Sequence, residues 1–348
     1  MKNRYTNYFV IFLTCLIHAA CTPDFDAVDL FELNDGTYFP YLIKDKAIDK
    51  GVDIVVMGDG FTEADLMNGT YQNVMKTAVE ALFEIQPYKA YRNYFNVYIV
   101  GAVSLERGIS DIGITKRTKF EAAYTDEEPD TGMTMNRDRC QEYAKRTPIA
   151  GINSTLIILV TNSTRYGGTC YFSSAGWAIA ICPMSTSSYP YDFTSIVRHE
   201  AGGHGFAKLA DEYLSAETAA TRNREDVAHW HGYGYYANVD LTGDPAKVLW
   251  KSFIGEPKYN MVGTFEGAYY FDTGVWRSEQ GSCMINNISY FNAPSRAAIV
   301  KRIYALTGRS FSLQDFMNRD IIEPAPSTKA GGIEGSLPAL APPVGIIE

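Results

Sequence analysis

The stretch VDIVVMGDGFT, residues 52–62, decides the fold class, because it joins a buried strand to the start of a helix. Its first part is rich in β-branched apolar residues, which is typical of a strand covered on both faces. The two glycines permit a tight turn, and Thr62 with Asp65 has the spacing of a helix-capping box. Apolar residues then recur at helical spacing from Met67 to Phe83. We therefore expect a strand, a turn and a helix that packs on a sheet.

Strands and helices continue to alternate along the chain. The sequence predicts strands at 95–100, 155–160 and 177–181, a helix from about residue 193 and another over 295–306. This alternation predicts an α/β domain in which helices pack on a mixed sheet. Strand 177–181 has two interpretations, an edge strand that pairs with an extended peptide or a core strand.

The N-terminus has the pattern of an export signal. Lys2 and Arg4 precede an apolar run over residues 8–17, which is shorter than the roughly 20 residues of a membrane span. Small residues before Cys21 resemble a bacterial lipobox, although His18 departs from it, so we expect a lipid on Cys21. The alternative is plain secretion with Cys21 in a disulfide. We therefore expect an exported protein, either an outer-membrane or periplasmic lipoprotein or a secreted one.

These features divide the chain into four segments. We assign residues 1–20 to the signal peptide, 21–45 to a tether and 46–310 to one folded domain. Residues 311–348 are rich in Pro, Gly and Ala without hydrophobic periodicity, which predicts a disordered tail.

Charge and cysteine content restrict the partners. The 348 residues carry a net charge of −9 without a Lys/Arg run that could follow a phosphate backbone, which excludes nucleic acid as a partner. We expect a monomer that meets a membrane only through the lipid on Cys21. Export would permit disulfides, in any of three pairings, among Cys140, Cys170, Cys182 and Cys283.

The segment HEAGGH, residues 199–204, carries the chemistry. A His-Glu pair followed by a second His is the zinc-peptidase arrangement, with His199 and His204 as ligands. The spacing is one residue longer than usual, and on a regular helix residues five apart point about 140° apart and could not share an ion. A π-bulge at Gly202 and Gly203 would absorb the extra residue. The alternative is that both histidines are ordinary polar residues.

Two histidines leave zinc one protein ligand short. We favour Asp211, which requires the helix to bend or end before it, with Gly205 as a plausible break. Glu212, His229 and His231 remain open as alternatives.

The expected mechanism assigns a role to each further residue. Zinc would polarise the scissile carbonyl and lower the pKa of its bound water, while Glu200 takes the water proton and passes it to the leaving amine. Among the possible oxyanion donors Tyr213, Tyr269, Tyr270 and Arg277 we choose Tyr270. Met284, in a predicted turn, lies either beneath the metal or simply in the core.

The run from His199 to Tyr213 resembles the IgA-peptidase family of bacterial zinc metallopeptidases, whose motif is followed at a fixed distance by Leu-x-Asp-Glu-Tyr. Further segments that look like family landmarks are 58–62, 95–97, 264–268 and 282–284. The extra residue between the histidines is similar to the His-Glu-x-x-Gly-His form of the dipeptidyl-peptidase III family, where both histidines bind zinc. The resemblance implies a zincin-like zinc metallopeptidase domain over 46–310, and it leaves the substrate open.

We therefore expect a zinc-dependent endopeptidase that acts on a protein or peptide substrate. Two alternatives remain open: a non-catalytic surface lipoprotein that binds peptide or glycan in the same groove, and an exopeptidase. The Glu200 carboxylate argues against the binding protein, because binding alone needs no base.

Overall fold

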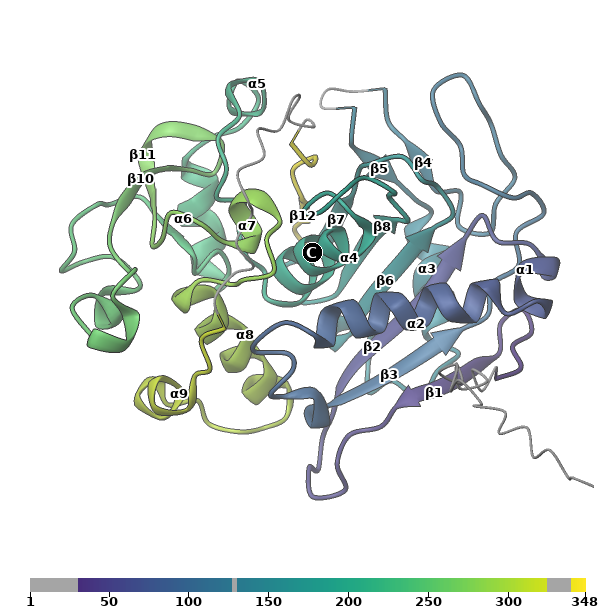
Figure 1. The fold of residues 1–348 in the computed structure, drawn as a ribbon, viewed down its shortest axis with the longest axis horizontal. Coiled ribbons are helices and arrows are strands. Elements are labelled where there is room, and N and C mark those ends of the chain that lie inside the picture. The colour runs from purple at the N-terminus through teal and green to yellow at the C-terminus, as the bar shows by residue number, and fades with distance from the viewer. Residues whose placement is uncertain (1–30, 127–129, 324–338) are drawn as a thin grey trace, which may run out of the picture. The chain divides into compact units, whose positions relative to one another are not determined.

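A seven-stranded mixed sheet is the central element of the described residues, which are 31–126, 130–323 and 339–348 (Figure 1). This computed structural model confirms the predicted α/β class. The strands, in sheet order, are β1 (Tyr38–Leu42), β3 (Phe95–Val100), β2 (Val52–Asp59), β6 (Leu156–Thr161), β8 (Ala178–Pro183), β7 (Thr169–Ser173) and β12 (Val344–Ile346). The predicted signal peptide and the lipid site at Cys21 lie outside the described residues.

The middle of the sheet is parallel and its borders are mixed. Strands β3, β2, β6 and β8 run parallel, whereas β1 pairs antiparallel with β3 and β7 pairs antiparallel with β8. Every residue of β2, β6 and β8 is buried, as expected for strands covered on both faces.

Helices cover both faces of this sheet. The helices are α1 (Glu63–Met67), α2 (Thr70–Phe83), α3 (Arg137–Ala144), α4 (Phe193–Ile196), α5 (Ala216–Ala219), α6 (Glu225–Gly232), α7 (Cys283–Asn286), α8 (Ala293–Leu306) and α9 (Leu313–Arg319). A π-helix, Val197–Phe206, continues directly from α4. Short 3₁₀ turns occur at Arg92–Tyr94, Ile152–Ser154, Lys251–Phe253 and Pro257–Tyr259. Smaller sheets are formed by β9 (Val239–Asp240), β10 (Phe265–Ala268) and β11 (Phe271–Arg277), and by β4 (Ala123–Tyr124) and β5 (Met133–Thr134).

Successive residues of β2 face opposite sides of the sheet, which separates two cores. Ile54 and Val56 pack in a cluster with residues of α2 and the π-helix, whereas Val55 and Met57 pack in a cluster with residues of α3. Figure 1 shows α2 on the near side of the sheet and α3 behind it. The predicted capping box also forms, because the Thr62 amide donates to the Asp65 carboxylate at 2.9 Å.

The C-terminal segment differs from the predicted disordered tail. Helix α9 lies at 313–319, and β12 pairs with β7 as the last strand of the sheet. A three-residue strand containing glycine carries almost no periodicity, so its order depends on β7 rather than on local sequence. The predicted tether also contains the ordered strand β1. Residues 324–338 lie outside the described part of the chain.

Two further expectations are corrected. Strand β8 lies between β6 and β7, so the core interpretation of 177–181 holds and the edge interpretation is wrong. The four cysteines of the domain are free and buried, so none of the three pairings forms among them. No helix in the described ranges has the length and apolar character needed to cross a membrane.

Candidate metal centre

The HEAGGH segment lies within one continuous π-helix of ten residues, Val197–Phe206. A π-helix joins residue i to residue i+5, so His199 and His204, five apart, face the same side. The sequence predicted a single-turn π-bulge here, and the structure confirms π-type geometry but extends it over the whole ten-residue helix. Gly203 permits close packing here, because a Cβ atom on it would lie 2.2 Å from the sulfur of Met284. The extra residue in the motif is thus absorbed by the helix type.

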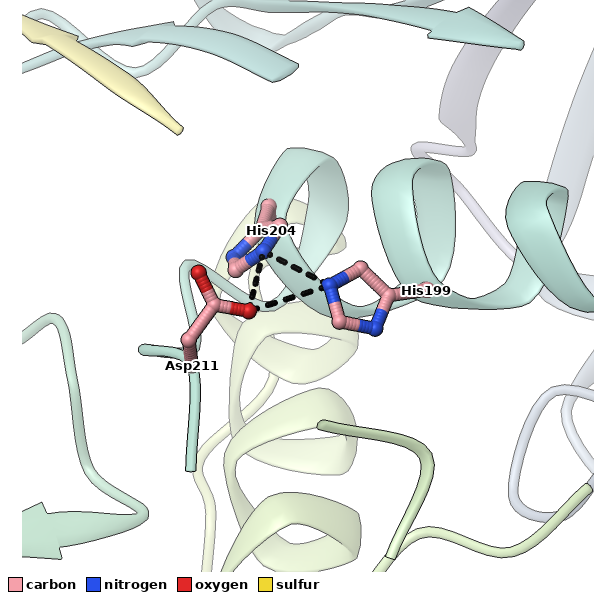
Figure 2. A group of neighbouring side chains, drawn as sticks. All are labelled: His199, His204 and Asp211. Carbon is pink, nitrogen blue, oxygen red and sulfur yellow. Dashed lines mark hydrogen bonds and ion pairs between the residues drawn. The ribbon is translucent and has the colours of Figure 1, made fainter. Parts of the chain in front are cut away.

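Asp211 reaches the two histidines because the helix ends early. The π-helix stops at Phe206, and Lys208 takes a positive φ of 55° that turns the chain back. The predicted break at Gly205 is therefore displaced, since Gly205 is still helical. Figure 2 shows that the Asp211 carboxylate points at both imidazoles.

The three side chains bring one atom each to a common point. His199 Nε2 lies 3.0 Å from His204 Nε2, and each of these nitrogens lies 3.1 Å from Asp211 Oδ1. A tetrahedral zinc ion with bonds of about 2.0–2.1 Å holds its ligand atoms about 3.3 Å apart. The observed triangle therefore fits one small cation. Among the described residues, His199, His204 and Asp211 form the group that could hold it.

The outer hydrogen bonds of the imidazoles fix which nitrogen is free. His199 Nδ1 lies 3.0 Å from the Cys283 carbonyl, and His204 Nδ1 lies 2.8 Å from the Leu209 carbonyl. A carbonyl can only accept, so each Nδ1 donates, and Nε2 of a neutral ring then carries a lone pair. Two lone pairs and a carboxylate oxygen thus converge, and a metal cation would satisfy all three. Such carbonyl partners are typical of metal-binding histidines.

Asp211 is held from its other side by Tyr270. The Tyr270 hydroxyl donates to Asp211 Oδ2 at 2.5 Å, and the Tyr269 amide donates to the Asp211 carbonyl at 3.1 Å. Burial alone would raise the pKa of Asp211, but the nearby His204 and His199 rings hold it below its usual value. Tyr269 and Tyr270 have φ of 49° and 74°, a conformation that costs non-glycine residues about 1–3 kcal/mol each and concentrates at functional sites.

Glu200 lies beside the cluster with a free carboxylate. It is fully buried, and neither oxygen has a hydrogen-bond partner among the described residues. Burial raises the pKa of Glu200 to about 8, which the neighbouring His199 partly offsets. A Cβ atom on Gly168 would lie 3.0 Å from Glu200 Oε1, so this glycine lets the backbone approach the carboxylate. An unpartnered buried carboxylate next to a metal-binding cluster can hold a proton for a reaction there.

Glu212 faces away from the cluster and organises the loops around it. Its carboxylate accepts from Asn238 Nδ2 at 2.9 Å, from Asn292 Nδ2 at 2.7 Å and from the Ser282 hydroxyl at 2.5 Å. The Glu212 amide donates to the Met284 carbonyl at 2.8 Å. Glu212 therefore joins the chain after Asp211 to the N-termini of α7 and α8.

The remaining sequence candidates do not contribute to the three converging atoms. His229 is exposed on α6, and His231 lines a separate cavity of about 570 Å³ beside α8. Arg277 has two buried nitrogens without a partner in the described ranges. Tyr213 directs its hydroxyl to the Leu340 carbonyl at 2.6 Å. The Met284 sulfur packs against Gly203, between the two histidines of the motif.

The cluster is closed from solvent. His199 is 1 % exposed, and His204, Asp211 and Glu200 are each 0 % exposed. Tyr270, which is bonded to Asp211, is itself 2 % exposed. Access to the metal centre therefore requires part of the surrounding structure to move.

A buried His–His–Asp cluster beside a glutamate, on a mixed α/β sheet, is the arrangement expected of a metallopeptidase domain. The chain belongs to the IgA peptidase family, because the family model described as IgA Peptidase M64 matches residues 42–260, more than half of the chain. The match contains the motif and Asp211 and ends before the proposed landmarks at 264–268 and 282–284. A comparison with curated proteins gave no match.

Several residues of the centre could not be found from the sequence. The Leu209 and Cys283 partners are backbone carbonyls, which any residue type would supply. Asn238 and Gly168 lie far from the motif in sequence and follow no recognisable spacing. Only their repeated occurrence beside the motif in related sequences could have pointed to them.

Proposed function

We propose that this protein is a zinc-dependent endopeptidase. The observation that carries the proposal is the buried, unpartnered carboxylate of Glu200 beside the converging atoms of His199, His204 and Asp211. A binding site needs no isolated carboxylate, and burying one is costly unless it is used. The donor set of two imidazoles and one carboxylate is a common one for catalytic zinc.

The chain's own residues divide the work of peptide-bond hydrolysis. When bound, zinc would supply Lewis acidity that polarises the scissile carbonyl and makes water more acidic. Glu200 takes the proton of the attacking water on a carboxylate oxygen and returns it to the nitrogen of the leaving amine. His199, His204 and Asp211 hold the ion in place.

Tyr270 acts in this proposal as a positioning residue. Its hydroxyl is bonded to Asp211 Oδ2, which orients Oδ1 toward the histidines. The sequence-based role of oxyanion donor would require this hydrogen bond to break during the reaction. Arg277, with buried nitrogens that lack a partner among the described residues, is an alternative donor from the original four.

The proposal includes location and partners. The predicted export signal and the lipobox-like Cys21 support a lipoprotein of the outer membrane or periplasm, or a secreted protein that acts on protein or peptide substrates. We propose that it works as a monomer attached to the membrane only by that lipid.

A comparison of Glu200→Gln with wild type tests the function. Both proteins are loaded with zinc, their metal content is measured, and their cleavage of a peptide library is recorded. We expect equal zinc content and a loss of cleavage by at least about 100-fold in Glu200→Gln, the lower end of general acid–base contributions. Glu217→Gln, an exposed carboxylate on α5, is the matched control and should retain full activity. Full activity in Glu200→Gln, or no bound metal in wild type, would refute the proposal.

The burial of the cluster favours one competing function, a lipoprotein that binds peptide without cleaving it. That function predicts saturable peptide binding, unchanged peptides after prolonged incubation and no difference between wild type and Glu200→Gln.

A further inference from the structure

The last ten residues of the chain, 339–348 with the sequence ALAPPVGIIE, lie along strand β7 and are here called the C-terminal strap. Val344, Gly345 and Ile346 pair in parallel with Tyr171, Phe172 and Ser173. The Ser174 amide donates to the Ile346 carbonyl at 2.9 Å, and Trp177 Nε1 donates to the Glu348 carboxylate at 3.2 Å. The strap therefore binds as an extended peptide added to the edge of the sheet (Figure 1).

Strand β7 leads to the metal centre. Gly168, directly before β7, approaches the Glu200 carboxylate, and Cys170 in β7 packs against Gly205 of the π-helix. Because β12 and β7 run parallel, the strap residues before Val344 run back toward this start of β7. A peptide on this edge would thus extend toward the base.

The strap is joined to both sides of the centre. On one side, the Thr131 hydroxyl donates to the Ala339 carbonyl at 2.8 Å. The Thr131 carbonyl in turn accepts from the Gly168 amide at 3.1 Å, and Gly168 lies against Glu200. On the other side, the Leu340 carbonyl accepts from Tyr213, whose ring lies 5.4 Å from that of Tyr270. Tyr270 in turn holds Asp211.

We propose that the edge of β7 is the binding surface for extended peptide substrates, and that the C-terminal strap occupies this surface within the same chain and closes the approach to Glu200. This inference rests on the proposed peptidase function. It accounts for the 0–1 % exposure of the converging residues, since Leu340 is buried and is connected to Asp211 through Tyr213 and Tyr270. A cavity of about 210 Å³, lined by Thr169, Arg222 and Ala341, marks where the surface would open when the strap leaves.

The same contacts define the substrate class. A Cβ atom on Gly345 would lie 2.1 Å from the Trp230 ring, which is fixed by Phe172 at a centroid distance of 4.9 Å. The neighbouring Ile346 packs against the core cluster on the α3 side of the sheet. The edge therefore accepts peptides with a glycine facing Trp230 and an apolar residue next to it. Gly345→Val should displace the strap without shortening the chain.

The experiment uses four proteins: the full chain, a chain that ends at residue 338, Gly345→Val, and the control Ile347→Val at a position that is 61 % exposed. Folding is checked by circular dichroism and thermal unfolding, and zinc content by metal analysis. Two readouts follow: hydrolysis of a peptide library, and binding of fluorescein-labelled ALAPPVGIIE by anisotropy. The same labelled peptide with valine in place of its glycine tests the contact with Trp230.

We expect the shortened chain and Gly345→Val to hydrolyse peptides at least tenfold faster than the full chain and Ile347→Val. Labelled ALAPPVGIIE should bind the shortened chain at least tenfold more tightly than the full chain, the valine peptide should bind more weakly, and excess ALAPPVGIIE should inhibit the shortened chain. If the shortened chain does not fold, Gly345→Val is judged by the same readouts.

The outcomes separate this inference from the peptidase function. If the full chain cleaves peptides as fast as the folded shortened chain and Gly345→Val, the strap does not close the site, whereas the peptidase function stands. If labelled ALAPPVGIIE binds the full and shortened chains equally, the strap does not occupy the surface. If no variant cleaves any peptide although the labelled peptide binds only in the absence of the strap, the strap and its surface are supported and the peptidase function fails.

Discussion

The hydroxyl of Tyr270 donates a 2.5 Å hydrogen bond to Asp211 Oδ2, the carboxylate oxygen that does not face the histidines. This bond fixes the rotation of the carboxylate, so that Oδ1 stays 3.1 Å from both imidazole nitrogens. Tyr270 holds this position with a positive φ of 74°, a conformation that non-glycine residues adopt at a cost of about 1–3 kcal/mol.

Tyr270→Phe should weaken metal binding while the fold is retained. Loss of a hydrogen bond to a metal ligand typically lowers affinity by about 10–100-fold. Competition with a chromophoric chelator measures the zinc affinity, and circular dichroism checks the fold. Tyr269→Phe is the matched control, since that ring is adjacent and the change keeps the backbone amide that donates to the Asp211 carbonyl. An unchanged zinc affinity in Tyr270→Phe would show that the hydroxyl does not position the ligand.

Asp211→Asn should mainly lower zinc affinity and Glu212→Gln should mainly lower folding stability, although the two residues are neighbours in the sequence. Asp211→Asn removes the negative charge at the cluster, so zinc affinity should fall with little change in folding. Glu212→Gln should leave zinc affinity nearly unchanged and lower the free energy of unfolding by about 1–3 kcal/mol. The buried amide nitrogen of Asn238 or Asn292 would then face an NH₂ group, which cannot accept its hydrogen bond. Zinc titration and urea unfolding of the metal-free proteins separate the two effects. Glu212 is the true ligand if Glu212→Gln loses zinc and Asp211→Asn does not.

Gly203→Ala should destabilise the protein more than Gly202→Ala. Both changes gain about 1 kcal/mol of intrinsic helix propensity. The added methyl would lie 2.2 Å from the Met284 sulfur at position 203, whereas its nearest neighbour at position 202 is a Leu82 carbon at 3.1 Å. Overpacking of this kind costs about 1–3 kcal/mol, so unfolding experiments should rank the two variants clearly.

Met284→Ala provides the check on this interpretation. It removes the sulfur that the methyl group added at position 203 would meet, so the double variant should be more stable than the sum of the two single effects predicts. Purely additive effects would mean that Gly203 is needed for the π-helix itself and not for contact with Met284.

The sequence predicted those parts of the structure whose signals are local. The capping box at Thr62 depends on a residue three positions later, and the buried strands depend on runs of apolar residues. The prediction that HEAGGH departs from a regular helix if both histidines bind one ion came from the angle between residues five apart, and that angle follows from the spacing alone.

The parts that were missed depend on distant partners. Strand β12 has three residues and exists because β7 offers it an edge, so nothing within VGI distinguishes it from a disordered tail. No strand was predicted at 169–173, because the preceding Gly167 and Gly168 are typical of a turn, whereas in the structure Gly168 lets the backbone approach Glu200. The predicted export would permit disulfides among the four cysteines, but each is buried in the core as a free thiol.

The ion pair between Arg296 on α8 and Asp320, the C-cap of α9, tests whether the C-terminal region belongs to the domain. Both side chains are at most 2 % exposed, and the guanidinium binds the carboxylate through Nε at 2.9 Å and Nη2 at 2.7 Å. Asp320→Ala leaves a buried charge without its partner, which should lower the free energy of unfolding by about 3–5 kcal/mol. Glu142→Ala breaks an exposed pair with Arg146 and should cost no more than about 1 kcal/mol. Urea unfolding at fixed pH measures both, and equal small losses would place residues 311–320 outside the folding unit, as the sequence alone suggested.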